Sequence, residues 1–562
     1  MTDFPIVVGV NRTQDGSIAV AVGESGMYSL QKERVSRRKH HWGRLGDLPD
    51  RYLPAMPLLK EPVDLVVEGY SSDTEIEHAV AYQQEARATL SLKDGAPIVL
   101  VSHHLSHLYS AFPPSPFERA AGLVIDVRGS RAADFTEHVE LPPGTDGDLL
   151  EVGSFYRCSR EEGVECLAKQ LWDGDWDRPA GLGAFFALVT DMLWPDEEEQ
   201  DRVTGLAPYG DPDALGLPDL DVRGHEVHVP PEWLEVFGRG DAFVYEPGGG
   251  AFRRAANLAA AGQRAFERAL ARLADWLHER TGLDALVYAG DSALNSPANG
   301  RLVRASPFRE VFVPPSPHDG GTAVGCALYG LIACLGVDSR FRWTDDFLGP
   351  DPDESAIEAA VRALPIGLHA ERPDLPAGLY AERPADLAGE ITALLASGLV
   401  VGLHQGRSES GPRTLGNRSV LADPRYLQDH LTFEVLGNEW FRPLGSLVLA
   451  GHTERIFDVD RPVTQATVAV RPEFRDLLPG ITHVDGTARP RTVEPVATPF
   501  LHALLTRWHE RTGVPVLINA ALGDPPAETP EHAIEVLRST GLDALAMPPY
   551  LIRKTTRNPR SG

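Results

Sequence analysis

Gly406-Arg-Ser-Glu-Ser-Gly-Pro-Arg-Thr-Leu-Gly-Asn-Arg-Ser419 follows an apolar segment, Gly398-Leu-Val-Val-Gly-Leu403, that is typical of a buried strand. The stretch holds three arginines, Arg407, Arg413 and Arg418, and is interrupted by glycine and proline. Glycine and proline hold a tight turn, and a guanidinium group binds an oxyanion through two parallel hydrogen bonds. The stretch therefore predicts a loop that binds a small phosphorylated or carboxylate-like ligand. The alternative is a surface loop with solvated charges.

The composition is that of a globular protein with an acidic surface. The 562 residues are 43% hydrophobic and carry a net charge of −27, so we expect two or three domains and no general nucleic-acid binding. No close Cys-x-x-Cys pair and no continuous apolar span occurs, which argues against a zinc knuckle, a disulfide scaffold and a membrane helix. The N-terminus does not resemble a signal peptide. We therefore expect a cytoplasmic protein.

Apolar strands that end in polar loops alternate with helical segments through the first half of the chain. Ile6–Val10 and Ile18–Val22 predict a hairpin, and Ala255–Gly282 predicts a long helix. This alternation indicates an α/β sheet with ligands at the strand ends. The composition changes around residues 338–385, where aspartate and proline become frequent. We expect a boundary there and a second domain of a different fold, because no internal repeat is evident.

Two histidines follow the strand Ile98–Val101. His103 and His107 are four residues apart, so they share one face of the helix that we expect to begin there. This spacing suits a metal ion, and Asp126 at the end of the next strand adds an oxygen ligand. The alternative is that the histidines cap or pack the helix.

Two glycine-containing loops precede predicted helices in the same half. They are Ala289–Gly300 and Ser316–Gly325. Glycines before a helix N-terminus let backbone donors approach a phosphate, and the helix dipole favours negative charge. Together with the turn at Asn11–Ser17 the loops predict a nucleotide cleft, with Asp319 placed to hold a metal beside the phosphates. Either loop alone is also compatible with an ordinary tight turn.

The second half adds more arginines near predicted strand ends. Arg442 lies between an aromatic residue and a proline, and Arg489 ends the segment His483-Val-Asp-Gly-Thr-Ala-Arg489. Asn519 follows the predicted strand Val514–Ile518. If Arg413, Arg442 and Arg489 converge, they form a site for a small dianion. Otherwise each arginine pairs with one of the many acids.

These segments, in this order, resemble the natural-product O-carbamoyltransferases, the group that includes antibiotic-tailoring and nodulation-factor carbamoyltransferases. The similarity covers nearly the whole chain. It is carried by the following segments: His103–His107, Ser110–Phe112, Gly205–Gly210, Ala293–Asn295, Ala298–Gly300, Asp319–Gly325, Glu409–Ser419, Phe441–Pro443 and His483–Arg489.

The resemblance implies an α/β fold in two parts. Residues 1–345 would form a two-lobed domain of the actin/sugar-kinase type (RNase H-like, ASKHA), residues 346–380 a linker region, and residues 381–562 an α+β YrdC-like domain. The implied reaction takes carbamoyl phosphate and ATP to carbamoyl adenylate and transfers the carbamoyl group to an acceptor hydroxyl in secondary metabolism. A divalent metal, of the iron type or Mg/Mn, would sit with the nucleotide. A homodimer is one expected assembly.

The same resemblance assigns roles by position. Metal ligands would be His103, His107, Asp126 and Asp319. Carbamoyl phosphate would be bound by Arg413, Arg442, His483, Asp485, Arg489 and Asn519, and nucleotide by Gly290, Asn295, Asn299, Gly320, Gly321 and Thr322. Catalytic residues would be Asp15, Gln14, Arg413 and Asn519.

Several positions that have a functional role in the family carry a different residue in this sequence. Gln14 stands where the family has a histidine, and a glutamine amide cannot hold a proton near neutral pH. Asp291 places a carboxylate where phosphate is expected, and Val127 stands in place of a glycine. The remaining departures are Leu436, Asn438, Ala520 and Ala521, which replace two cations and two hydroxyls. A lost charge-assisted contact weakens binding by about 1.5–3 kcal/mol.

Two other functions remain open from the sequence. One is a catalytically impaired homologue that acts as a nucleotide-binding or protein-partner scaffold, which the clustering of departures favours. The other is a sugar-kinase-type phosphotransferase, which the arginine-rich second half disfavours.

Overall fold

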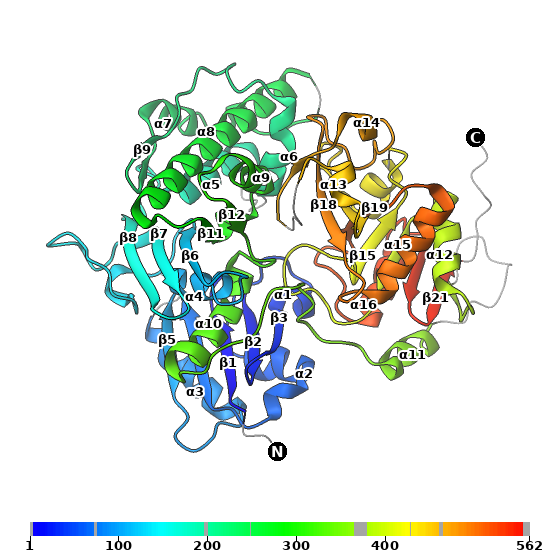
Figure 1. The fold of residues 1–562 in the computed structure, drawn as a ribbon, viewed down its shortest axis with the longest axis horizontal. Coiled ribbons are helices and arrows are strands. Elements are labelled where there is room, and N and C mark those ends of the chain that lie inside the picture. The colour runs from blue at the N-terminus through cyan, green and yellow to red at the C-terminus, as the bar shows by residue number, and fades with distance from the viewer. Residues whose placement is uncertain are drawn as a thin grey trace. The chain divides into compact units, whose positions relative to one another are not determined.

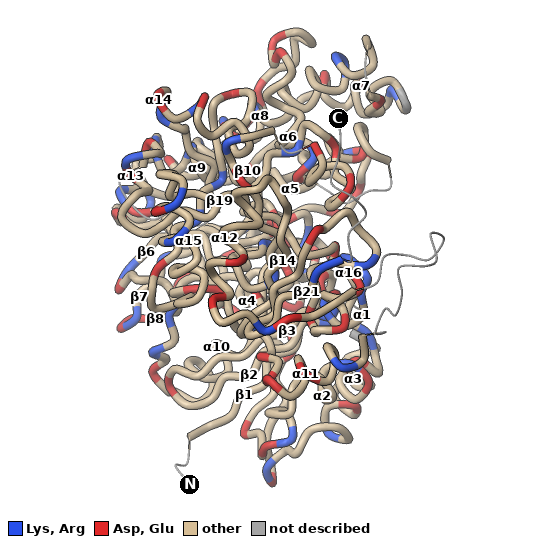
Figure 2. Tube along the Cα trace, turned by 90° about the vertical axis from the view of Figure 1, so that its right-hand side faces the viewer, with Lys and Arg blue, Asp and Glu red and all other residues tan. Residues whose placement is uncertain are grey.

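The computed structural model describes residues 4–71, 76–195, 200–247, 249–364, 379–427, 429–459 and 465–554 (Figure 1). The chain forms two compact units. The first comprises Met1–Ser36, His40–Thr344 and Gln465–Thr467, and the second comprises Arg37–Lys39, Asp345–Thr464 and Val468–Gly562. Basic and acidic positions are interspersed along the trace (Figure 2). Among the described residues, every helix is too short or too polar to traverse a bilayer.

The first sheet of unit 1 has five strands in the order β3-β2-β1-β4-β5. Their bounds are β1 Ile6–Asn11, β2 Ser17–Val22, β3 Gly26–Gln31, β4 Leu65–Tyr70 and β5 Ile98–Ser102. The first three strands form an antiparallel meander, and β4 and β5 continue from β1 in parallel. The predicted hairpin of β1 and β2 is confirmed.

The second sheet of unit 1 repeats this plan, in the order β12-β11-β6-β7-β8. Its strands are β6 Arg119–Ile125, β7 Leu150–Ser159, β8 Gly163–Trp172, β11 Ala285–Ala289 and β12 Glu310–Phe312. Here β6, β7 and β8 are antiparallel, and β11 and β12 continue from β6 in parallel. The expectation of no internal repeat is therefore corrected at the level of topology. The α/β class is confirmed. The two-lobed kinase-like type stays a prediction.

Helix α10 Thr322–Tyr329 lies against helix α4 His103–Ala111 and against β1. Two glycines permit this close approach. A Cβ on Gly9 of β1 would lie 2.1 Å from the carbonyl oxygen of Ala323, and a Cβ on Gly325 would lie 1.8 Å from that of Ser106. Both distances are far below any allowed contact, so the glycines set how closely α10 sits against β1 and α4.

The other elements of unit 1 surround these two sheets. The long predicted helix is α8 Gly249–Thr281, which buries its alanine-rich face. The remaining elements are α1 Lys32–Ser36, α2 Leu53–Ala55, α3 Ile76–Thr89, α5 Leu182–Leu193, α6 Gln200–Leu206, α7 Pro231–Phe237, α9 Ser296–Ala305, β9 Asp221–Arg223 and β10 Glu226–His228.

Unit 2 is built on one nine-stranded sheet in the order β13-β21-β20-β14-β15-β19-β16-β18-β17. The strands are β13 Leu379–Glu382, β14 Val401–His404, β15 Arg418–Ala422, β16 Gly445–Leu449, β17 Val468–Ala469, β18 Thr487–Val493, β19 Val516–Ala521, β20 Ala544–Met547 and β21 Tyr550–Lys554. The helices are α11 Glu354–Arg362, α12 Leu387–Ala396, α13 Thr453–Ile456, α14 Pro472–Arg475, α15 Pro499–Thr512 and α16 Pro530–Ser539.

The core of unit 2 lies between one sheet face and the helices α12 and α15. Leu395 and Trp508 from these helices pack on Leu403, Leu447 and Leu517 from the sheet. A YrdC-like assignment for this unit stays a prediction.

Two details differ from expectation in unit 2. The predicted linker at 346–380 contains regular structure, because Asp346 is buried and α11 lies within it. Residues 365–378 lie outside the described residues. Asn519 lies inside β19 rather than after it, because the strand runs on through the two alanines at 520 and 521.

Candidate functional site

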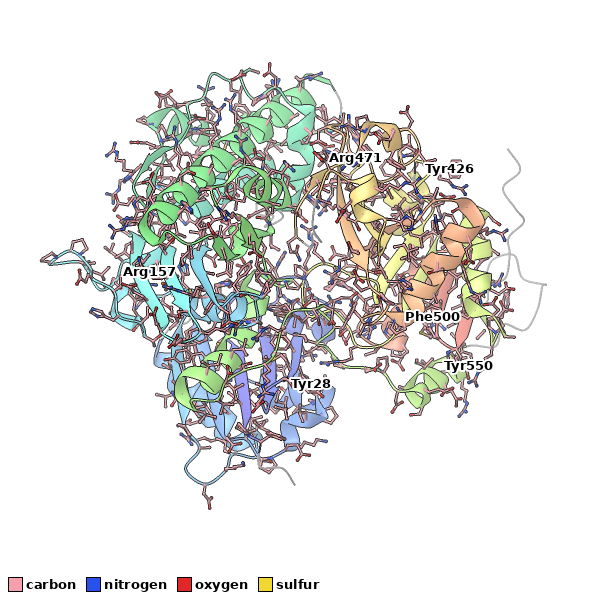
Figure 3. All side chains as sticks on the ribbon, viewed as in Figure 1. Tyr28, Arg157, Tyr426, Arg471, Phe500 and Tyr550 are labelled. Atoms are coloured by element: carbon pink, nitrogen blue, oxygen red, sulfur yellow. The ribbon has the colours of Figure 1, made fainter. Side chains whose placement is uncertain are left out.

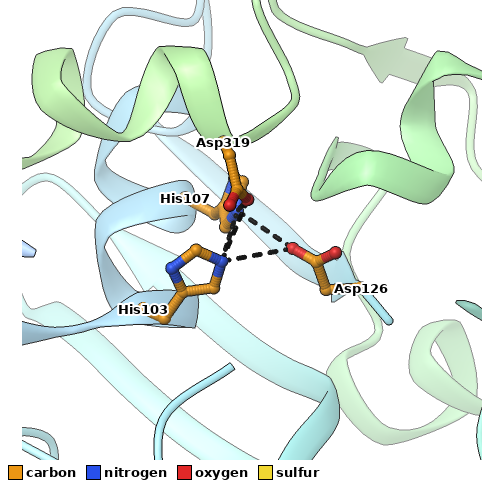
Figure 4. Close-up of side chains that lie close together, drawn as sticks. All are labelled: His103, His107, Asp126 and Asp319. Atoms are coloured by element: carbon orange, nitrogen blue, oxygen red, sulfur yellow. Dashed lines mark hydrogen bonds and ion pairs between the residues drawn. The ribbon is translucent and has the colours of Figure 1, made fainter. Parts of the chain in front are cut away.

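The two histidines and two aspartates predicted as metal ligands converge in unit 1 (Figure 4). His103 and His107 begin α4 at the end of β5, Asp126 directly follows β6, and Asp319 lies just before α10. One ligand atom of each residue lies within 4.8 Å of the others, and all four residues are buried. Two of the elements involved, α4 and α10, are the ones that Gly325 allows to approach closely.

The distances within the cluster are those of groups aimed at one point. Nε2 of His103 lies 3.1 Å from Asp319 Oδ1 and 3.4 Å from Asp126 Oδ2. Nε2 of His107 lies 3.3 Å and 3.1 Å from the same two oxygens. The two Nε2 atoms are 3.2 Å apart.

This donor set fits a divalent cation. Oδ2 of Asp126 is buried and has no hydrogen bond among the described residues, although both imidazoles are close to it. Two imidazoles and two carboxylates that direct lone pairs into one volume are ligands that transition metals bind readily. Burial alone would raise the pKa of Asp126, but the imidazoles of His103 and His107 outweigh it and lower that pKa to about 2. The carboxylate is therefore in its ligating form.

Neighbouring polar groups hold the ligands in place. The hydroxyl of Thr13 lies 2.9 Å from Asp319 Oδ2, and Nδ2 of Asn11 donates to the carbonyl oxygen of Asp319 at 3.0 Å. Behind α4, Glu151 accepts from the backbone N–H groups of His104 and Ser130, each at 3.0 Å. Groups of this kind orient metal ligands. Neither Thr13 nor Glu151 was predicted from the sequence, although Thr13 lies in the turn Asn11–Ser17.

Glu151 belongs to a wider buried network. Lys169 pairs with Glu151 and also lies 2.7 Å from Glu137, and all three side chains are almost fully buried. The ammonium group of Lys169 offsets part of the charge of the two carboxylates away from solvent, and such a buried network helps to fix the segments that it joins.

Asp291 lies beside the cluster, where the family pattern has glycine. Its Oδ1 accepts from the backbone N–H of Asp319 at 3.2 Å. Burial, followed by the charges of Asp126, Asp319 and Asp15, raises the pKa of Asp291 well above its usual value. The departure therefore adds a carboxyl group that stays protonated to a higher pH than usual. In that protonated form it both donates and accepts hydrogen bonds.

The predicted nucleotide loops have closely packed backbones. Gly290 has φ 95°, and a Cβ there would lie 2.2 Å from the carbonyl oxygen of Ile125. A Cβ on Gly321 would lie 2.0 Å from that of Ser316, and one on Gly320 would lie 2.3 Å from Nε2 of Gln31. The hydroxyl of Thr322 donates to the carbonyl oxygen of Asp319 at 2.6 Å.

The two asparagines of these loops make internal contacts. Asn295 caps α9 by accepting from the backbone N–H of Ala298, and it exchanges hydrogen bonds with Gln263. Asn299 donates to the carbonyl oxygens of Ala293 and Gln465, each at 2.7 Å. Their amides thus shape the loops, and direct nucleotide contact by either stays a prediction.

In unit 2 the arginine-containing turn connects β14 and β15 around a buried carboxylate. Oε1 of Glu409 accepts from the backbone N–H groups of Leu415, Asn417 and Arg418 at 2.7, 2.9 and 3.3 Å. Arg418 belongs to β15, where its buried guanidinium donates to the carbonyl oxygen of Gln405 at 2.6 Å. Arg418 is therefore a structural residue, whereas Arg413 lies in the loop.

Strand register places Arg489 and Asn519 on the same sheet face. Gly445 of β16 pairs with Arg489 of β18 on one side and with Asn519 of β19 on the other. Residues directly opposite each other point to the same face, and Gly445 has no side chain between them. Nδ2 of Asn519 donates to the carbonyl oxygen of Thr414 at 2.6 Å, which ties this row to the arginine turn.

The other predicted donor-binding residues lie at the same end of these strands. Arg442 is three residues before β16 and lies 3.7 Å from Glu439, a long ion-pair distance. Nε2 of His483 lies 3.0 Å from the carbonyl oxygen of Phe441, so the two segments are adjacent. Asp485 accepts from the backbone N–H of Thr487 at 2.9 Å and shapes the turn before β18.

Arg491 was not identified from the sequence. It lies two residues beyond Arg489 on the same face of β18, and its Nη1 is buried without a hydrogen-bond partner among the described residues. Burial lowers its pKa against the opposing effect of Asp346, Asp345 and Glu409. Its spacing of two from Arg489 is the signal that could have found it.

Comparison with known proteins places this sequence among the carbamoyltransferases. Residues 392–554 match the Carbamoyltransferase C-terminus family and residues 242–328 the Carbamoyltransferase N-terminus family. Nodulation protein NolO of Bradyrhizobium diazoefficiens is 31% identical over 81% of this chain and 79% of its own length. The chain belongs to the carbamoyltransferase family. Nodulation protein NolNO of Sinorhizobium fredii is 33% identical over 83% of this chain, which spans 65% of the length of NolNO.

These matches confirm the predicted resemblance to the carbamoyltransferase family, and with it the predicted enzyme class. Among solved structures, T. kodakarensis HypF has a TM-score of 0.37 and 14% identity, over 60% of this chain and 48% of HypF. A ROK family glucokinase from Streptomyces griseus has a TM-score of 0.28 and 11% identity, over 57% and 98%. These two likenesses are too distant to carry weight.

Proposed function

We propose that this carbamoyltransferase uses ATP and a divalent metal to transfer a carbamoyl group from carbamoyl phosphate, through carbamoyl adenylate, to a hydroxyl of a small-molecule natural product. The observation that carries the proposal is the buried cluster of His103, His107, Asp126 and Asp319. These residues would hold the metal beside the predicted nucleotide loops. When bound, such an ion neutralises nucleotide phosphate and polarises a carbonyl group.

The residues of unit 2 would bind the donor. Carbamoyl phosphate is a small dianion with a labile acyl bond. Arg413, Arg442 and Arg489 would hold its phosphate and stabilise charge on the leaving oxygen. Asn519 is aligned with Arg489 across Gly445 and would orient the carbamoyl amide.

The residues of unit 1 would bind the nucleotide and the acceptor. Gly320, Gly321 and Thr322 immediately precede or begin α10, where backbone N–H groups and the helix dipole favour a phosphate. The close backbone approaches at Gly290 and Gly321 leave no room for a side chain there. The acceptor hydroxyl would then attack the carbamoyl carbon and displace AMP.

An exchange assay tests the first half of the reaction without knowledge of the acceptor. Purified protein, ATP, labelled pyrophosphate and a divalent metal should show label in ATP only when carbamoyl phosphate is present. Treatment with a chelator should abolish the exchange, and adding back the metal should restore it. Folded protein that binds nucleotide but shows no exchange would contradict the proposal and favour the scaffold function instead.

A further inference from the structure

Two loops of unit 1, residues 13–16 and 40–43, contact each other backbone to backbone. The N–H of Gly16 donates to the carbonyl oxygen of His41 at 3.0 Å, and that of Gly43 donates to Thr13 at 2.9 Å. A Cβ on Gly16 would lie 2.6 Å from the nitrogen of Gly43, and a Cβ on Gly43 would lie 2.7 Å from Cα of Arg12. Only glycine allows so close an approach.

This contact brings His40 onto Asp15. Nδ1 of His40 lies 3.0 Å from Oδ1 of Asp15. The backbone φ is 50° at both residues, in the left-handed region that residues other than glycine rarely adopt. Such strain persists where surrounding contacts impose it, and it gathers at functional sites. Here the imposed conformation serves one contact, between a carboxylate and an imidazole.

The pair has the form of an oriented base. The Asp15 side chain is 6% exposed, whereas that of His40 is 32% exposed. A carboxylate that accepts from Nδ1–H leaves Nε2 as the basic nitrogen of a neutral imidazole. Asp15 is buried and His40 is accessible, so the orienting group is protected while the ring can meet a substrate.

Other charged groups surround the pair. Oε2 of Glu33 accepts from the backbone N–H of His40 at 3.3 Å, and Arg34 adjoins Glu33. Nε2 of His318 lies 3.9 Å from Oδ2 of Asp15. Asp15 thus favours a proton on His40. Burial raises the pKa of Glu33 and lowers the pKa of His318, so both of these neighbours are shifted towards their neutral forms.

The pair is also connected to the metal cluster. Nδ2 of Asn11 lies 3.3 Å from the carbonyl oxygen of Asp15 and 3.0 Å from that of Asp319. One side chain therefore bridges the loop of the pair and the loop of a metal ligand. The neighbouring Gln14 cannot act as a base, because its amide does not bind a proton near neutral pH.

We infer that His40 is the general base that takes the proton from the acceptor hydroxyl, and that Asp15 is the positioning residue that orients its ring. This inference rests on the proposed function. The hydroxyl proton passes to Nε2 while the hydroxyl oxygen forms a bond to the carbamoyl carbon. The bond from that carbon to the AMP phosphate oxygen breaks, AMP leaves with the electron pair, and the imidazolium returns its proton to solvent.

The test separates adenylate formation from transfer. Pyrophosphate exchange reports the first, and release of AMP with water as the only nucleophile reports the second. In His40→Gln we expect exchange to stay within about twofold of wild type and AMP release to fall by about 10²–10⁴-fold, the usual contribution of a general base. Hydroxylamine, which attacks as a neutral amine without a base, should restore AMP release in this variant.

His41→Gln is the matched control, because its ring contacts Ser36 at 2.8 Å rather than Asp15. Both rates should stay near wild type. In Asp15→Asn, loss of the carboxylate should lower the pKa of His40, so the rise of AMP release with pH should shift to lower pH. If Asp15 had only a structural role, its replacement would not shift the pH dependence of AMP release.

The outcomes are distinct. Absence of exchange in wild type would overturn the proposed function and this role together. Intact exchange with unchanged AMP release in His40→Gln would overturn the role of His40 alone. Equal loss of both rates, with no rescue by hydroxylamine, would show that His40 supports the fold of the loop rather than proton transfer.

Discussion

The hydroxyl of Thr13 lies 2.9 Å from Oδ2 of Asp319, a residue 306 positions later in the chain. One end of this contact belongs to the loop after the first strand and the other to a member of the metal cluster. The contact orients the carboxylate whose other oxygen faces His103 and His107. It joins the turn after the first strand directly to the candidate metal site.

Removing that hydroxyl should weaken metal binding. Thr13→Val keeps the shape of the side chain but removes its hydrogen bond, so Asp319 loses orientation. Loss of such a supporting group typically costs about 10- to 100-fold in metal affinity. Titration of the apoprotein with a divalent metal, followed by calorimetry, measures the change. Thr13→Ser should retain wild-type affinity, and equal affinity in all three proteins would contradict the assignment.

Deleting a ligand should remove stabilisation by metal. At a metal concentration of 100 times Kd, binding to the folded state adds about 2.7 kcal/mol to stability. We therefore expect added metal to raise the Tm of wild type and to leave that of His107→Ala unchanged. His138→Ala, on an exposed histidine, is the control and should respond like wild type. A metal-dependent Tm in His107→Ala would mean that the cluster is not the binding site.

Changing the shape of the Arg489 side chain should weaken donor binding. Arg489→Lys keeps the positive charge but loses the planar fork that binds a phosphate in two places. A lost charge-assisted contact costs about 1.5–3 kcal/mol, or about 10- to 150-fold in Kd. Calorimetry with carbamoyl phosphate measures it. The matched control is Arg471→Lys, since Arg471 (labelled in Figure 3) is 40% exposed and 3.9 Å from Asp458. Similar affinities in both variants would argue against the predicted donor site.

Unit 2 should carry a pH-dependent stability from Asp346. Burial raises the pKa of this carboxyl to about 7, although hydrogen bonds from Ser410 and Gly411 oppose the shift. In the unfolded chain the pKa is about 3.9, so between these values the folded state binds more protons and stability falls as pH rises. The shift is worth up to about 4 kcal/mol between pH 4 and 7.

Asp346→Asn removes this titration. The Tm of the variant relative to wild type should therefore increase as pH rises from 5 to 8. Asp351→Asn, on an exposed residue in the same unit, should show a constant difference from wild type. A constant difference for Asp346→Asn as well would mean that the carboxyl titrates normally in the folded state.

Local sequence pattern was enough for much of the site. The spacing of His103 and His107 places them on one face of a helix, and glycine before α10 predicts a phosphate-binding turn. Family motifs then carried Asp126 and Asp319 into the same predicted site. These predictions depend on backbone periodicity and on strand ends, which neighbouring residues determine.

Other features depend on contacts between distant parts of the chain. Asp319 meets His107 across 212 positions, and Glu409 acquires its role only when the turn folds around its carboxylate. The shared topology of the two sheets of unit 1 leaves no trace in the sequence, because many sequences satisfy one order of strands. Arg418, one of the three arginines of the stretch 406–419, is a buried part of β15.

The sequence by itself determined the family, the α/β class and the residue types of the metal cluster, since each is encoded in short segments. Tertiary structure alone decided that His40 lies on Asp15 and that Gly445 separates Arg489 from Asn519. The reason is physical: strand register and close backbone approach at glycines such as Gly9, Gly16 and Gly325 are set by packing between distant segments, and no local periodicity reports them.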